Sequence, residues 1–137
     1  MMELIKPLKI SSAGMNVQTT RLRVLAENIA NADSLPGTAG VEPYRRKVVT
    51  FKNALDRSIG VETVRINKIG TSKGDFQRRY DPTHPAADKD GYVQAPNVNA
   101  LIEMMDFREA QQSFQANLGV LDMSKRMITS TIDLLRS

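Results

Sequence analysis

An apolar residue recurs at every seventh position near the carboxyl end of this chain, and this repeat constrains the fold more than any other feature. Its members are Phe107, Phe114, Leu121, Ile128 and Leu135. A spacing of seven puts side chains on one face of an α-helix and is typical of helices that pack against other helices. The repeat predicts a helix over residues 100–135, roughly 54 Å long if unbroken.

This predicted helix has more apolar surface than one partner helix would cover. The stripe widens on one side through Met104, Leu118 and Ile132, and on the other through Val120, Met127 and Leu134. We therefore expect several neighbouring helices. A polar band in the middle has two interpretations, a solvated face or hydrogen bonds that set the register between subunits. Its members are Gln111, Gln112, Gln115 and Asn117.

A second repeat lies near the amino end. Met15, Leu22 and Ile29 stand seven apart, and the neighbouring positions carry Val17, Val24, Leu25 and Ala32. We expect this helix to start at Ser11 or Ser12, either of which can act as an N-cap, and to end near Ala32. Gly14 would weaken an exposed helix interior, so either the helix frays there or a neighbouring backbone approaches closely, and we favour the close approach.

Residues 36–99 lose the helical period and are punctuated by Pro and Gly. The best strand candidates are residues 47–51 and 61–69, with shorter ones at 75–80 and 92–94. Residues 51–59 are equally consistent with a helical turn. The predicted fold class is mainly α: two long terminal helices, 1–35 and 100–137, pack as an α-helical coiled coil around a small β-containing or irregular insert, 36–99.

The composition excludes most catalytic and metal chemistry. The chain has no Cys, and His84 is its one histidine, so thiolate sites and most His-based catalysis are ruled out. Residues 88–91, Asp-Lys-Asp-Gly, resemble the start of a calcium loop but lack its remaining ligands, which favours a turn. We expect neither an enzyme nor a cofactor, metal ion or small-molecule substrate.

Positive charge is concentrated in the middle segment, in two short clusters. The first is Arg45, Arg46 and Lys47, and the second is Arg78 and Arg79. Such clusters can bind phosphates or an acidic neighbour, but few aromatic residues interleave them, and solvated surface is their usual role. We therefore do not expect nucleic-acid binding.

The unequal lengths of the two predicted helices argue for assembly. The shorter helix covers only part of the longer one, which leaves a row of large apolar side chains for other chains to bury. If these chains are identical copies, a head-to-tail contact that does not close produces a helical filament.

Three stretches carry a family resemblance. The first is Ser12-Ala13-Gly14-Met15-Asn16 with Arg21-Leu22 and residues 27–32, Glu-Asn-Ile-Ala-Asn-Ala. The second is Asp81-Pro82-Thr83-His84-Pro85 with Gly91-Tyr92-Val93 and Pro96-Asn97-Val98-Asn99. The third is Glu109-Ala110 with residues 113–117, Ser-Phe-Gln-Ala-Asn. Together they resemble the bacterial flagellar axial family of rod and hook proteins, and within it the basal-body proximal rod protein of the FlgC type.

The resemblance implies a structural subunit of the periplasm-spanning rod of the flagellar basal body. Such subunits leave the cell through the flagellar type III export apparatus and polymerise with copies of themselves and other rod proteins through their terminal helices. The distal rod and the basal-body ring are further implied neighbours. A cytoplasmic helical adaptor or export chaperone is the alternative, followed by a basic nucleic-acid-binding module.

Two sets of residues follow as candidates for function. The predicted assembly interface comprises Met15, Val17, Leu22, Leu25, Ile29, Met104, Phe107, Phe114, Leu118, Leu121, Ile128 and Leu135. The family-motif positions are Asn28, Asn31, Pro82, His84, Pro85, Gly91, Asn97 and Asn99. Catalytic, cofactor and metal residues are expected to be absent.

Overall fold

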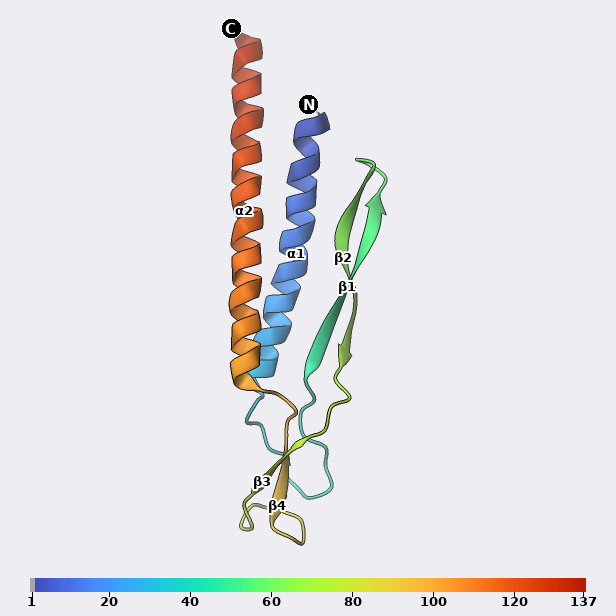
Figure 1. Cartoon of the computed structure of the whole chain (residues 1–137), viewed down its shortest axis with the longest axis vertical. Coiled ribbons are helices and arrows are strands. Elements are labelled where there is room, and N and C mark those ends of the chain that lie inside the picture. The colour runs from blue at the N-terminus through green and yellow to red at the C-terminus, as the bar shows by residue number, and fades with distance from the viewer. Residues whose placement is uncertain (1) are drawn as a thin grey trace. The chain divides into compact units, whose positions relative to one another are not determined.

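A computed structural model describes residues 2–137 of the chain. A helix lies at each end, α1 (Met2–Ala30) and α2 (Ala100–Arg136), and four strands lie between them (Figure 1). The strands are β1 (Lys47–Asp56), β2 (Val61–Thr71), β3 (Gln77–Tyr80) and β4 (Tyr92–Ala95). β1 pairs with β2, and β3 pairs with β4.

The predicted fold class is wrong. The chain is 48% helical and 21% strand, with two small antiparallel sheets, and is not clearly a mainly-α coiled coil. The strand content is high because β1 and β2 have 10 and 11 residues, longer than the sequence pattern suggested. The helical-turn alternative for residues 51–59 is also wrong, since β1 stays extended as far as Asp56.

The first helix begins earlier than expected, at Met2, and includes Pro7. Pro7 is the sixth residue of the helix and lies beyond the first donors that lack helical partners, so it removes the hydrogen bond that a backbone N–H at this position would donate to the carbonyl of Glu3. The second helix matches its predicted bounds to within a residue. Within residues 2–137, neither helix is both long and apolar enough to cross a membrane.

The chain divides into two compact units, and both helices contribute to each. Unit 1 contains the residues up to Leu22, Thr50–Lys68 and Arg108–Ser137, whereas unit 2 contains Arg23–Val49 and Ile69–Phe107. Each unit therefore joins segments that are far apart in sequence.

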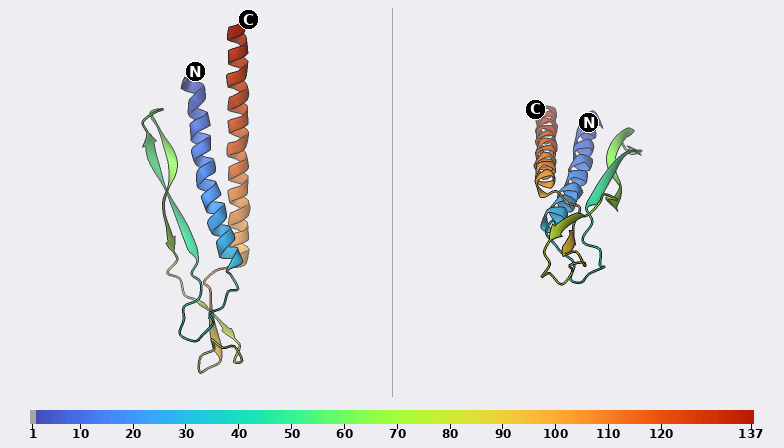
Figure 2. Two further views of the ribbon diagram at one scale, coloured as in Figure 1. Left: turned by 180° about the vertical axis from the view of Figure 1, so that it is seen from behind. Right: turned by 60° about the horizontal axis from the view of Figure 1, so that its bottom comes forward.

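In unit 1, α1 lies between α2 and the β1–β2 hairpin (Figures 1 and 2). The tip of the hairpin is anchored on this unit by Ile59, which is buried, and by Lys9, whose Nζ donates to Ser58 Oγ at 2.6 Å. Gly60 closes the turn with a positive φ of 70°, which glycine adopts without strain. These contacts hold the hairpin alongside α1.

In unit 2, β3 and β4 pair antiparallel, with Arg79 opposite Val93 and Tyr80 opposite Tyr92. Val93 and Ala95 are fully buried and alternate with exposed residues along β4. This alternation is expected for a two-stranded ribbon with one face on a core. The other face presents Tyr80 and Tyr92 edge to face, with ring centroids 5.3 Å apart.

Candidate functional site

The helix pair of unit 1 packs through small and polar side chains. Ala110, Asn117 and Ser124 stand seven apart on α2; Ala110 and Ser124 are buried and Asn117 is half-buried. Opposite them on α1, a Cβ added to Gly14 would lie 2.8 Å from Asn117 Nδ2. The close approach at Gly14 is therefore to a side chain and not to the neighbouring backbone that the sequence predicted: glycine leaves room on α1 for the amide of Asn117.

The large apolar repeat of α2 flanks this seam instead of filling it. Four members of the repeat are half-buried, namely Phe107, Phe114, Leu121 and Ile128, and the fifth, Leu135, is exposed. On α1, Val17 and Leu25 are buried, while Met15, Leu22 and Ile29 are half-buried. Met104 and Leu118 are exposed. The residues predicted as the assembly interface therefore lie partly within the chain's own packing and partly on its surface.

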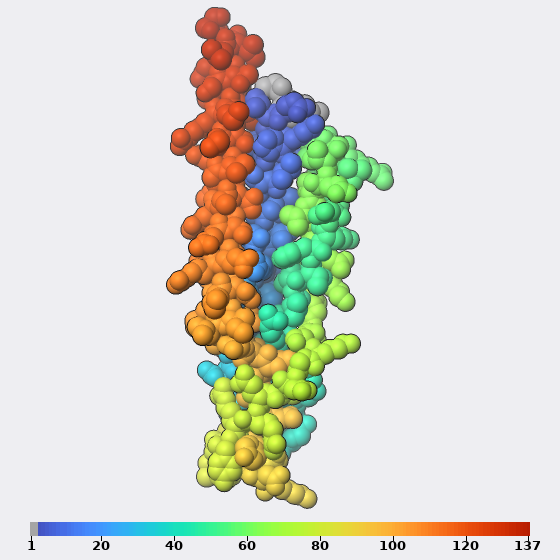
Figure 3. Space-filling model, viewed as in Figure 1, coloured from blue at the N-terminus to red at the C-terminus, as the bar shows by residue number. Residues whose placement is uncertain are grey.

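A second apolar row on α2 is uncovered. It consists of Val120, Met123, Met127 and Leu134, all exposed and spaced by three, four and seven residues, and we call it the outer stripe. In Figure 3 the orange and red atoms of α2 form a flank of unit 1 that neither α1 nor the hairpin covers. The sequence pattern identified three of its members as a widening of the main stripe but missed Met123. Met123 stands three residues after Val120 and four before Met127, and this helical spacing could have identified it from the sequence.

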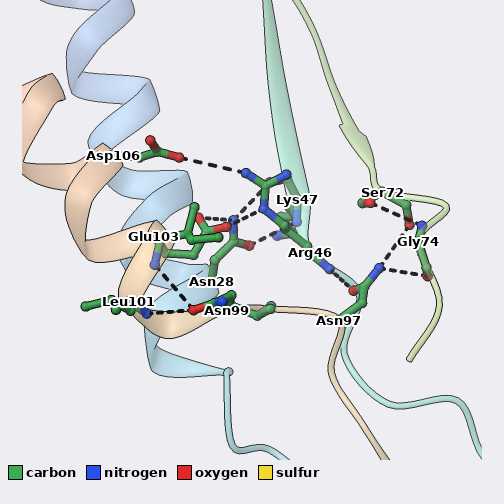
Figure 4. Close-up of polar contacts among 12 residues, drawn as sticks. Asn28, Arg46, Lys47, Ser72, Gly74, Asn97, Asn99, Leu101, Glu103 and Asp106 are labelled. Atoms are coloured by element: carbon green, nitrogen blue, oxygen red, sulfur yellow. Dashed lines mark hydrogen bonds and ion pairs between the residues drawn. The ribbon is translucent and has the colours of Figure 1, made fainter. Parts of the chain in front are cut away.

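The motif residue Asn28 sits at the centre of a buried hydrogen-bond network in unit 2 (Figure 4). Its Nδ2 donates to the carbonyl of Lys47 at 2.9 Å and to Glu103 Oε2 at 3.2 Å. Its Oδ1 accepts from Lys47 N at 2.9 Å and from Tyr44 Oη at 2.7 Å. With four hydrogen bonds to three residues, this amide joins α1, the start of β1 and the first turn of α2.

Glu103 is a buried carboxylate with a charged partner. Only 1% of its side chain is exposed, and Arg46 Nε donates to it. Arg46 Nη2 also lies 4.0 Å from Asp106 Oδ2. A buried charge is tolerated only when it is paired and hydrogen-bonded, and Arg46 and Asn28 meet both needs here.

The motif residues Asn97 and Asn99 hold the chain at the start of α2 (Figure 4). Asn97 Oδ1 accepts from Arg46 N at 2.8 Å, and its Nδ2 donates to the carbonyl of Gly74 at 3.1 Å. Asn99 Oδ1 accepts from Leu101 N at 3.1 Å, which is the geometry of a helix N-cap. Asn31 acts locally, donating from Nδ2 to the carbonyl of Glu27 at 2.8 Å.

The remaining motif residues shape the loop between β3 and β4. His84 Nδ1 accepts from Ala86 N at 3.0 Å, while Pro82 and Pro85 beside it are exposed. Gly91 has a φ of 82°, and an added Cβ would lie 3.0 Å from the Tyr80 ring. Glycine is therefore required there for both conformation and space.

The turn predicted at residues 88–91 is confirmed. Asp88 Oδ1 accepts from Asp90 N and Tyr92 N, each at 2.9 Å. These backbone donors, that of Tyr92 foremost, and the nearby Arg78 hold the pKa of Asp88 below its ordinary value of 3.8. The carboxylate thus organises the turn.

Both basic clusters are neutralised within unit 2. Arg45 pairs with Glu42 at 3.3 Å, Lys47 with Glu27 at 2.9 Å, Arg78 with Asp88 at 3.6 Å and Arg79 with Asp33 at 2.7 Å, and Arg46 pairs with Glu103. The Glu27–Lys47 hydrogen bond lowers the pKa of Glu27 and raises that of Lys47. Because each cation already has a carboxylate partner, the clusters do not form a free phosphate-binding surface.

Comparison with known proteins decides the family. Flagellar basal-body rod protein FlgC of Agrobacterium fabrum is 54% identical over 129 residues, which cover 94% of this chain and 93% of that protein. The chain belongs to the FlgC family of flagellar basal-body rod proteins. FlgC of Salmonella typhimurium is 38% identical over 97% of the chain and 98% of its own length, and FlgC of Bacillus subtilis is 31% identical over 93% and 95%.

A profile of the family described as flagellar basal body rod FlgEFG protein C-terminal also matches residues 89–134. This range contains β4, most of α2 and the outer stripe. Membership of the FlgC family makes the chain a structural protein of the flagellar basal-body rod and not an enzyme. The adaptor and nucleic-acid hypotheses are set aside on the same ground.

Proposed function

We propose that this rod protein polymerises through the exposed faces of its terminal helices, with copies of itself and with other rod proteins. The observation that carries this proposal is the outer stripe, a helix-spaced row of large apolar side chains that the described residues leave uncovered. Exposed apolar rows of this kind mark protein interaction sites. Burial by a neighbouring helix would remove them from water.

The residues predicted from the sequence extend this surface. Leu118 and Met104 are exposed on another side of α2, and the half-buried Phe114 and Leu121 still present part of their surface to a neighbour. We propose that the terminal helices, 1–35 and 100–137, supply the common assembly contacts. The insert, 36–99, supplies the contacts that distinguish one neighbour from another, including the distal rod and the basal-body ring.

We also propose that the chain reaches the rod through the flagellar type III export apparatus. The absence of Cys means that no disulfide opposes threading of an extended chain. Helices that expose large apolar surfaces gain burial on docking, which offsets the entropy lost on ordering. Secretion of the tagged chain from a strain with an intact export apparatus, and its loss from a strain in which that apparatus is deleted, would support this step.

The test of polymerisation compares two positions on the outer stripe with one beside it. The double variant combines Met123→Asp with Met127→Asp and puts two negative charges into the proposed contact. The control variant, Gln115→Asp, puts one negative charge on an exposed polar face of the same helix. The readout is the amount of each variant in purified hook-basal bodies, measured by mass spectrometry in a strain that lacks the native gene.

We expect the double variant to be exported but absent from the rod, and the Gln115 variant to be incorporated normally. Phe114→Asp and Leu121→Asp are expected to abolish incorporation as well, with the added effect of disturbing the chain's own helix pair. Normal rods built from the Met123 and Met127 double variant would contradict the proposal.

A further inference from the structure

Two methionines form the middle of the outer stripe. Met123 and Met127 stand four residues apart on α2, so they are neighbours on one face of the helix. Their exposed fractions are 64% and 51%. Val120 precedes them in the stripe and Leu134 follows, both exposed as well. More than half of each methionine is therefore open to small molecules in solution.

The composition makes methionine the side chain of this protein that mild oxidants attack first. The chain has 7 Met but no Cys and no Trp, so no thiol or indole competes with the thioethers. Among the methionines whose side chains the structure describes, only Met15 is half-buried. The others are more than half exposed, namely Met104, Met105, Met123 and Met127. These four should react before Met15.

Oxidation turns a methionine from an apolar side chain into a polar one. Hydrogen peroxide transfers one oxygen atom to the thioether sulfur: the O–O bond breaks, an S–O bond forms, the sulfur is oxidised by two electrons and water leaves. The product is a sulfoxide, whose polar oxygen disrupts methionine-rich contacts. Burying that oxygen without a hydrogen-bond donor costs free energy. In the outer stripe, two such oxygens would stand where a neighbouring helix packs.

We propose that Met123 and Met127 form a reversible oxidation switch that controls entry of the subunit into the rod. A subunit whose two thioethers are oxidised between export and docking does not assemble. A docked subunit is protected, because its neighbour covers the stripe. Enzymatic reduction of the sulfoxides restores the apolar stripe. This inference rests on the proposed polymerisation and assigns a regulatory role to two residues of the same contact.

Leucine variants test the switch, because Leu and Met exchange in apolar contacts at little cost and Leu has no sulfur. Two differently tagged copies are expressed together in a strain that lacks the native gene and methionine sulfoxide reductase activity. One copy is wild type and the other combines Met123→Leu with Met127→Leu. The readout is the ratio of the two tags in purified hook-basal bodies, measured by mass spectrometry. Because both copies share one cell, peroxide damage to other rod proteins affects them equally.

The peroxide dose is set by the wild-type chain itself. It is the dose at which half of the secreted, unassembled wild-type chain carries both sulfoxides. Without peroxide, we expect the two copies to enter the rod equally. At that dose the wild-type copy should enter about two-fold less often than the leucine variant, since its oxidised half is excluded. Wild-type chains within the rods should carry Met123 and Met127 unoxidised.

The matched control pairs the wild type with Met15→Leu. This change removes the half-buried methionine and leaves both residues of the switch oxidisable, so it should give no advantage under peroxide. An advantage as large as that of the double variant would overturn the assignment to Met123 and Met127.

The results separate this inference from the proposed function. An unchanged ratio under peroxide, equal sulfoxide fractions in assembled and unassembled chains, or thioethers that stay unoxidised at every dose the cells survive would each overturn the switch. Each of these outcomes leaves polymerisation through the outer stripe standing if Met123→Asp with Met127→Asp still blocks incorporation. Normal rods built from that aspartate variant overturn the proposed contact itself.

Discussion

Adding one methyl group at Gly14 should destabilise the helix pair of unit 1, although Gly→Ala in a helix usually stabilises. The new Cβ would lie 2.8 Å from Asn117 Nδ2 and 3.1 Å from both Cγ and Oδ1. Those atoms would have to move by several tenths of an ångström. Such crowding costs about 1–3 kcal/mol, whereas the gain in helix propensity is about 0.5–1 kcal/mol.

Asn117 has little freedom to retreat. Its Nδ2 donates to the carbonyl of Ser113 at 3.1 Å, and rotation of the side chain would break this bond, a loss of about 0.5–1.5 kcal/mol. Asn117 either stays and is crowded or rotates and loses this bond, so the two costs are not added. We therefore expect Gly14→Ala to lower the free energy of unfolding by about 1 kcal/mol, the cost of crowding less the gain in propensity.

The matched background is Asn117→Ala, which removes the crowding atoms. In that background Gly14→Ala should raise the free energy of unfolding by about 0.5–1 kcal/mol, from propensity alone. The two effects of the same substitution then differ by about 1–3 kcal/mol, a coupling typical of residues in contact. Urea unfolding followed by helical circular dichroism measures all four proteins. Equal effects of Gly14→Ala in both backgrounds would refute the close approach.

Three further outcomes follow from unit 2 and the helix seam. Glu103→Ala removes one of the four hydrogen bonds of Asn28 and the nearer carboxylate of Arg46, which is 31% exposed and keeps Asp106 at 4.0 Å; it should lower the free energy of unfolding by about 1–3 kcal/mol, measured by urea denaturation. Among the residues that the structure describes, Gln18 Oε1 is buried without a hydrogen-bond partner. Gln18→Met should therefore raise the free energy of unfolding by about 1 kcal/mol and the melting temperature with it, and a lowered melting temperature would contradict this. The pKa of Asp88 is lowered in the fold, so its negative charge stabilises the protein at pH values above 3.8, the ordinary pKa of the group. This stabilisation is lost as the pH falls through the lower pKa of the folded state. Asp88→Asn should flatten that part of an acid titration of stability followed by tyrosine fluorescence.

Local sequence signals accounted for most of the secondary structure. The seven-residue spacing from Phe107 to Leu135 predicted α2, and alternation around Val64 and Ile66 predicted β2. These signals are short-range, since helix and strand periods repeat within a few residues. The start of α1 was placed too late because Ser11 and Ser12 have the chemistry of an N-cap, whereas the helix begins at Met2 and continues through both.

The family motifs were found in the sequence without their physical roles. Three motif residues connect segments through hydrogen bonds: Asn28, Asn97 and Asn99. Only Asn99 bonds to a residue close to it in sequence. Asn28 meets Glu103, which is 75 positions away. No local pattern reports a bond of that separation, so the buried network could not be predicted from spacing.

The sequence by itself determined that two amphipathic helices flank a strand-bearing insert, that thiol and most histidine chemistry is absent, and that the chain resembles the rod proteins. Only the tertiary structure decided which face of each helix is covered. Gly14 and Asn117 meet at the seam because glycine leaves room for the Asn117 amide, Ala110 is buried beside them, and the larger Phe114 and Leu121 are only half-buried. The outer stripe is left uncovered for the same reason: burial depends on what a folded chain brings opposite each residue, and periodicity alone does not contain that information.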